Sequence, residues 1–307
     1  MRKEKFKAYL AWVNVCILWG TTYLAIRIGV GEWPPMLFAG LRWLLAGTIL
    51  VLYLRAKGYR MPGLKDFLNI SVMGILLLGF GNGLIVFSEM TIPSGLAALL
   101  ITTVPFWIVG LESLMPHGFR LNLKVILGLA VGLLGVAVIF WSDLSLLTEP
   151  AYMRGIISLL AAVFLWALGT LYSKYKRVSV APLTSAAFQM LTAGFLLSSM
   201  GFIFGEEHHL QAGFYGWMAF TYLVTFGSLL GYTSYIYAVS HLPVSFVSTY
   251  SYVNPVIALL LGWIVLGEKL NLSTLFAAAV ILLGVVLVKK GTGKRQDIPE
   301  EEKDGEI

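Results

Sequence analysis

The chain has 307 residues, of which 58% are hydrophobic and 12% are charged, and its mean hydropathy is +0.82. Soluble domains carry about 25% charged residues, so this composition excludes a soluble domain and predicts an integral membrane protein. The net charge of +6 does not indicate a nucleic-acid partner, because the basic residues lie in short segments between apolar runs. The single cysteine, Cys16, excludes an internal disulfide framework and a multi-cysteine metal site.

Apolar runs of about 20 residues, long enough to cross a bilayer as a helix, recur along the whole chain. The first, Tyr9–Ile28, follows a basic N-terminal segment (1–8) and has no small-residue cleavage site, so it is predicted to be a retained span. The tail, 290–307, is polar and is predicted to be disordered. The ten expected spans begin near Tyr9, Met36, Leu68, Ser94, Leu123, Ala151, Pro182, Gly213, Val244 and Asn271.

Lysine and arginine are distributed unequally between the two sides of these spans. Of the 22 such residues, all but four fall on the side that holds both termini. The exceptions are Arg27, Arg154 and Lys269 on the other side and Arg42 within a span. Because positive loops stay inside, both termini are predicted to be cytoplasmic.

The sequence also contains an internal duplication. Pro105 in the fourth expected span matches Pro255 in the ninth, 150 residues later, and the turn at 118–122 matches the turn at 267–271. Each copy holds five spans, an odd number, so the second copy must cross the membrane in the opposite sense. The predicted fold is therefore all-α and polytopic, with ten transmembrane helices arranged as two inverted five-helix repeats, an architecture common among secondary transporters.

The two repeats are assigned to residues 9–141 and 151–289. Several of their residues together resemble a known family: Trp19-Gly20, Arg42, the Pro-x-x-Ala/Leu runs of the fourth and ninth spans, and the Leu-Gly-Glu-Lys run that ends at Lys269. From roughly residue 11 to 288 the chain resembles the EamA branch of the drug/metabolite transporter superfamily. The resemblance implies a ten-helix carrier with a central cavity between its halves, which moves small metabolites such as amino acids, often outward. In the first copy Phe119 stands where the family pattern has an acid.

The substrate cavity is expected to be lined by polar and aromatic side chains at mid-span in both copies. In the fourth and ninth spans these residues share one helix face, and Pro105 and Pro255 would each free a backbone carbonyl there. The alternative is close helix packing, with the hydroxyl groups bonded to the preceding turn. The predicted cavity residues are Trp19, Tyr23, Asn82, Thr102, Trp166, Tyr172, Tyr232, Tyr235, Ser248 and Tyr252.

Three charged residues are candidates for a gate or a coupling site: Arg42, Glu89 and Glu112. Arg42 lies inside a span, where its charge requires water or an acidic partner. It either binds substrate or joins an ion-pair cluster with Glu32, Glu89 and Arg27 that closes the outer side. Glu112, near the cytoplasmic end of the fourth span, either binds a coupling proton or extends to the interface.

These features predict a secondary transporter that exports a small metabolite, such as an amino acid or a drug-like compound, by alternating access. The alternatives are a membrane-embedded transferase and a non-transporting scaffold. The sequence has no Gly-x-Ser-x-Gly, His-Glu-x-x-His or phosphate-binding glycine pattern, which speaks against an enzyme or a nucleotide-driven pump. Neither a cofactor nor a metal is expected. The expected partners are a small-molecule substrate and the lipid bilayer of the inner membrane, and a homodimer is possible through the small-residue face of Gly128 and Gly132.

Overall fold

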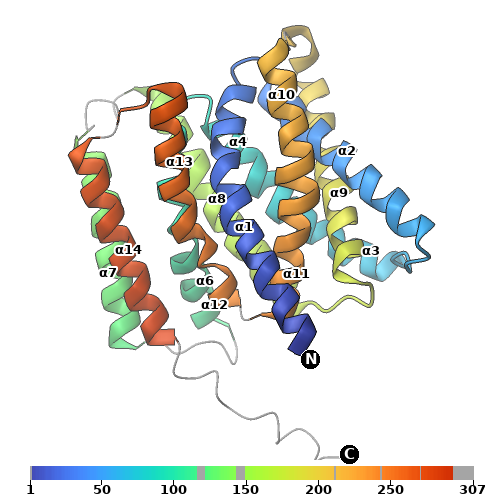
Figure 1. Ribbon diagram of the computed structural model, residues 1–307, viewed down its shortest axis with the longest axis horizontal. Helices are drawn as coiled ribbons and strands as arrows, with labels where there is room; N and C mark the ends of the chain where they lie inside the picture. Colours follow the sequence, from blue (N-terminus) through green and yellow to red (C-terminus); the bar gives the residue numbers. More distant parts are fainter. Residues whose placement is uncertain are drawn as a thin grey trace, which may run out of the picture.

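The computed structural model describes residues 2–115, 122–142, 149–210, 212–242, 244–269 and 271–292, and within these ranges all regular structure is helical (Figure 1). Pro243, Phe119 and the tail beyond Thr292 lie outside the described residues. The elements are α1 (Arg2–Gly29), α2 (Pro35–Ala56), α3 (Leu64–Gly74), η1 (Ile75–Asn82), α4 (Gly83–Ser88), α5 (Ser94–Ile101), α6 (Val104–Ser113), α7 (Leu123–Ser142), α8 (Pro150–Tyr175), α9 (Pro182–Ile203), η3 (Glu206–His209), α10 (Phe214–Tyr222), η4 (Leu223–Tyr232), α11 (Thr233–His241), α12 (Val244–Val247), α13 (Tyr250–Leu266) and α14 (Leu272–Thr292).

The helices form ten passes over the described part of the chain, in agreement with the ten predicted spans. Six passes are long and apolar enough by themselves to cross a membrane. The remaining four are α7, the run α10–η4–α11, the run α12–α13, and α14. An all-α polytopic membrane protein is therefore confirmed. The observed starts lie close to the predicted ones except in α1, which begins earlier, at Arg2.

Local sequence explains several helix ends. α2, α8 and α9 each begin with a proline, whose fixed φ suits the first helical position and whose missing N–H group is not needed there. α13 ends at Gly267, which adopts a left-handed φ of +66° that a side chain would disfavour.

Glycines allow the most extensive helix contacts, between α2 and α9 and between α7 and α14. A Cβ atom added to Gly194 would lie 2.4 Å from the Leu44 nitrogen, and one added to Gly284 would lie 2.5 Å from the Gly132 nitrogen. Only a glycine permits such backbone approach. The small-residue face of Gly128 and Gly132, on which the possible homodimer was predicted, thus packs against α14 within the chain, along one edge of the bundle (Figure 1).

The fourth and ninth passes are both interrupted, but at different places relative to their prolines. α5 and α6 are separated at Thr102 and Thr103, and Pro105 is the second residue of α6. α12 and α13 are separated at 248–249, whereas Pro255 lies inside α13. Pro105 therefore lies beside a helix break and Pro255 does not, and the expectation that each proline frees a backbone carbonyl stays a prediction. Hydroxyl groups bond the turns at both breaks, since Thr102 donates to the Leu99 carbonyl at 2.6 Å and Thr249 to the Phe246 carbonyl at 2.7 Å.

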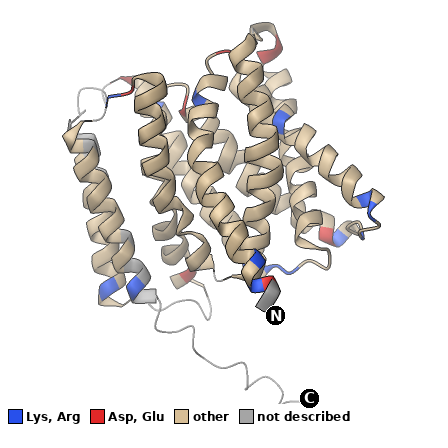
Figure 2. Cartoon of the chain, viewed as in Figure 1, with Lys and Arg blue, Asp and Glu red and all other residues tan. Residues whose placement is uncertain are grey.

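The third and eighth passes each contain a π-helical segment. η1 ends at Asn82 and η4 ends at Tyr232, which are 150 residues apart. The start of α1 and the end of α14 lie at the same end of the bundle, and most Lys and Arg residues gather there (Figure 2). The hairpin that carries Glu206 lies at the opposite end (Figure 1).

Candidate functional site

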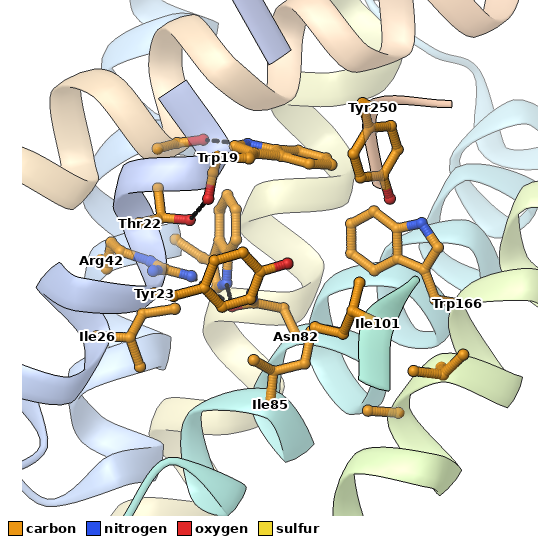
Figure 3. A pocket seen from close by; sticks show the side chains of 14 residues that line it. Trp19, Thr22, Tyr23, Ile26, Arg42, Asn82, Ile85, Ile101, Trp166 and Tyr250 are labelled. Carbon is orange, nitrogen blue, oxygen red and sulfur yellow. Dashed lines mark hydrogen bonds between the residues drawn. The ribbon is translucent and has the colours of Figure 1, made fainter. Parts of the chain in front are cut away.

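A cavity of about 50 Å³ lies inside the bundle and is walled by helices from both halves of the sequence (Figure 3). This volume holds roughly three to five water molecules. Its wall is mainly aromatic and aliphatic, with one cation and one amide. The lining residues are Trp19, Thr22, Tyr23, Ile26, Arg42, Trp43, Asn82, Ile85, Ile101, Ala162, Val163, Trp166, Gly227 and Tyr250.

Trp19 of α1 holds the aromatic side of the cavity together. Its ring lies 5.5 Å from Trp166 of α8, 5.1 Å from Tyr250 of α13 and 5.1 Å from Tyr235 of α11, measured between centroids. Its indole nitrogen donates to the Gly227 carbonyl at 3.2 Å. The contacts with Trp166 and Tyr250 are edge-to-face, an arrangement that stabilises fixed ring positions, so the aromatic wall is preorganised rather than a loose apolar surface.

Arg42 supplies the only cation among the lining residues, and its side chain meets Asn82 beside Tyr23 (Figure 3). The guanidinium group donates to Asn82 Oδ1 and lies 4.3 Å above the Trp43 ring. The indole nitrogen of Trp43 also donates to Asn82 Oδ1, at 3.2 Å. Arg42 is 2% exposed, its Nε has no hydrogen-bond partner, and no described carboxylate lies within 4.0 Å of it. The cavity wall therefore carries a positive charge that is not neutralised by direct contact.

The alternative in which Arg42 joins an ion-pair cluster finds no ion pair within 4.0 Å of Arg42 among the described residues. Arg27 donates to the main-chain carbonyl of Glu89 rather than to its carboxylate, and Glu32 accepts a hydrogen bond from the Gly216 nitrogen at 2.6 Å. Within the described ranges the only Lys or Arg ion pair is Lys174 with Glu112, and the His208 Nε2 atom lies 3.4 Å from Glu207 Oε1. The sequence places these charges near one end, but it does not specify which backbone groups compete for them.

Three glutamates, all from interhelical segments, bind the first backbone amides of other helices. Carboxylates are stabilised there because these N–H groups lack partners within the helix and because the N-terminal end of the helix dipole is positive. Each contact ties a loop to a distant helix, which the sequence analysis missed because the partners are far apart in the chain. The contacts are Glu32 with Gly216 N, Glu206 with Met36 N and Leu37 N, and Glu268 with Ser94 N, Ser94 Oγ and Gly95 N.

Three predicted cavity tyrosines lie outside the lining. The Tyr232 hydroxyl donates to Gln189 Oε1, and both side chains are fully buried. Tyr235 shares a 2.9 Å hydrogen bond with Thr170 and packs behind the aromatic wall. Tyr172 donates to Asn69 Oδ1 of α3 at 3.1 Å.

The predicted residues of the fourth and ninth passes also do not line the cavity. Thr102 is fully buried with its hydroxyl bonded to its own helix, Ser248 is buried, and Tyr252 is only partly buried. Tyr250 lines the cavity instead. The prediction assumed regular helical spacing from Ser248 to Tyr252, and the break at 248–249 changes which side chains face inward.

Trp43 and Glu112 are the remaining residues whose positions bear on the predicted site. Trp43 lines the cavity but was overlooked, although it neighbours Arg42 in sequence. Glu112 accepts hydrogen bonds from Lys174 and from the Tyr175 hydroxyl, the latter at 3.1 Å. This pairing of Glu112 with a lysine near the end of α6 agrees with the interfacial interpretation of Glu112.

Known proteins resemble the chain over nearly its whole length. The model of the EamA-like transporter family matches residues 6–141 and again 153–289. YedA of Escherichia coli K12, an uncharacterized inner membrane transporter, is 36% identical over 276 residues, which are 90% of this chain and 88% of YedA. A probable amino-acid metabolite efflux pump of Salmonella typhimurium LT2 is 27% identical over 297 residues, 93% of this chain and 94% of that one. One solved crystal structure superposes with a TM-score of 0.69 at 22% identity, over 94% of this chain and 98% of that chain.

Proposed function

This chain belongs to the EamA-like transporter family and is a multi-pass membrane transporter, and on that premise we propose that it exports amino acids or similar small carboxylates by alternating access. The observation that carries the substrate class is the position of Arg42. A buried guanidinium group without a carboxylate partner faces a small aromatic cavity. Planar guanidinium groups bind carboxylates through paired, charge-assisted hydrogen bonds.

The rest of the cavity suits the other parts of an amino acid. The faces of Trp19, Trp166 and Tyr250 offer apolar surface to a side chain and a negative ring potential to an ammonium group. The name of the relative from Salmonella, a probable amino-acid metabolite efflux pump, agrees with this substrate class and with outward transport.

We propose that the two halves act as inverted repeats that rock against each other around this cavity. Several matched features support the proposal: the family model matches once in each half, both halves carry a π-helical segment, and those segments end at Asn82 and Tyr232. In addition, α1 packs against η4 and α11, while α8 packs against η1 and α4. We further propose that both termini lie in the cytoplasm, a proposal supported by the Lys and Arg residues gathered at that end.

The test removes the carboxylate from the ligand rather than the arginine from the protein. Purified protein is heated in detergent with L-phenylalanine, L-phenylalaninamide or phenethylamine, and uptake of labelled L-phenylalanine is measured in proteoliposomes preloaded with each compound. We expect only L-phenylalanine to raise the melting temperature and to drive exchange, because a ligand that binds the folded state stabilises it. If the two cationic analogues act equally well, Arg42 does not select the substrate and the proposed class is wrong.

A further inference from the structure

Glu89, directly after α4, is a buried residue that is not among those lining the cavity. Its side chain is 0% exposed, and neither carboxyl oxygen has a hydrogen-bond partner within the described ranges. Buried polar atoms are nearly always hydrogen-bonded, and a buried charge without a partner is far less favourable than a neutral group. The surroundings shown here therefore suit the protonated acid, whereas an ionised Glu89 requires a cation to move towards it.

The charged groups that face Glu89 come from three neighbouring elements. Arg27 of α1, Arg42 of α2 and Glu268 of the segment before α14 interact with it electrostatically, and Tyr23 of α1 lies within the same field. Neither arginine comes within 4.0 Å of the Glu89 carboxyl oxygens, judged over the described part of the chain. Both cations are thus close enough to respond to the charge of Glu89 without being paired to it.

The hydrogen bonds of the two arginines show which of them can respond at the cavity. Arg27 donates to the main-chain carbonyl of Glu89, a contact that does not depend on the state of the carboxyl group. Arg42 donates to Asn82 and lines the cavity, where the proposed substrate carboxylate binds. An ionised Glu89 would attract Arg42 and repel a second carboxylate near it. Two anions therefore compete for one guanidinium group.

We propose that Glu89 is a proton-binding site linked to the cavity: a substrate carboxylate binds Arg42 when a proton from solvent occupies a Glu89 carboxyl oxygen, and both leave together. This inference rests on the proposed function. On binding, an O–H bond of a solvent hydronium ion breaks as the Glu89 O–H bond forms, and on release the proton returns to water; no other bond changes. Substrate and proton would then cross the membrane in the same direction, so a substrate gradient alone would move protons.

The experiment is calorimetric titration of the purified full chain with L-phenylalanine from pH 5.5 to pH 9, in two buffers of different ionisation enthalpy. We expect affinity to fall as pH rises, approaching tenfold per pH unit where free Glu89 is ionised, with uptake approaching one proton per ligand. Glu89→Gln keeps the shape of the neutral acid and should bind with the low-pH affinity of the wild type at every pH, without proton uptake. Glu112→Gln is the matched control and should keep the wild-type pH dependence.

Each other outcome has a definite meaning. Wild-type binding without proton uptake or pH dependence would overturn the proton site and leave the proposed substrate class intact. The same holds if Glu89→Gln retains the wild-type slope, or if Glu112→Gln alone removes it. Failure of L-phenylalanine to bind the wild type at any pH would overturn the proposed function, and the linkage with it.

Discussion

Two hydrogen-bonded pairs occupy matching positions in the two halves of the molecule, and only one of them faces the cavity. Arg42 donates to Asn82 in the first half, and Tyr232 donates to Gln189 in the second. Each pair joins the second and third passes of its half. Arg42 and Asn82 line the cavity, whereas Gln189 and Tyr232 are both 0% exposed. The comparison teaches that a side-chain hydrogen bond joins the second and third passes in both halves, and that it carries a charge only where it lines the cavity.

The two pairs also differ in how completely they are satisfied. Gln189 accepts from Tyr232 and donates to Ser185 at 2.8 Å, so its amide is used on both sides. Arg42 keeps an unpartnered Nε, and an unsatisfied buried group costs about 1–3 kcal/mol. The first pair is therefore expected to lower stability in return for an available donor, and the second to hold its two helices together.

The harshest way to break the comparison is to place the charge in the half without a cavity. Gln189→Arg buries a cation at a position whose hydrogen-bond partners, Tyr232, Ser185 and Met73, are all uncharged, and an uncompensated buried charge destabilises by about 3–5 kcal/mol. We expect poor expression and a clearly lower melting temperature in detergent. A variant as stable as the wild type would mean that the second half opens to water after all.

The converse exchange gives the first half the chemistry of the second. Arg42→Gln should weaken L-phenylalanine binding about 100-fold, because removing one partner of a buried charged pair costs about 2–5 kcal/mol. Its melting temperature should equal or exceed that of the wild type, since the charge and its unpartnered nitrogen are gone. Calorimetry and thermal unfolding of the same preparation separate the two effects. Equal losses of binding and stability would assign Arg42 to packing.

A milder change tests the structural pair alone. Tyr232→Phe leaves the Gln189 oxygen buried without its donor, which should destabilise by about 1–3 kcal/mol. Transport in proteoliposomes should stay within about twofold of the wild type, because neither residue touches the cavity. A transport defect without loss of stability would show that the second pair takes part in substrate handling.

The smallest effect is expected at Thr102. Thr102→Val replaces a hydroxyl group that bonds only to its own preceding turn, so both transport and melting temperature should change little, with stability within about 1 kcal/mol. If transport is abolished while folding is intact, the fourth pass opens towards the cavity in another conformation, as the sequence alone predicts.

The fold could be predicted further than the site. Span lengths and basic loops define the ten passes because a bilayer imposes both constraints on the sequence directly. Trp19 and Asn82 could be placed in the cavity because a polar or aromatic residue at mid-span needs a partner or water. The sequence could not show that Tyr250 lines the cavity and Tyr252 does not, since the break before α13 depends on local hydroxyl bonds rather than on Pro255. The contacts of Glu268 were equally hidden, because they depend on tertiary structure alone.

The glycine contact between α7 and α14 also bears on how the chain is made. The partner of α7 is α14, the last of the described helices, which begins about 130 residues after α7 ends. At a synthesis rate of about 5–20 residues per second, roughly 7–26 s pass between the completion of α7 and the first residues of α14. Among the described glycines that follow α7 in the chain, only Gly284 of α14 approaches the Gly132 backbone this closely. A chain cut before Leu272 would therefore lack the contact between Gly132 and Gly284, and α7 would lose its most extensive helix contact.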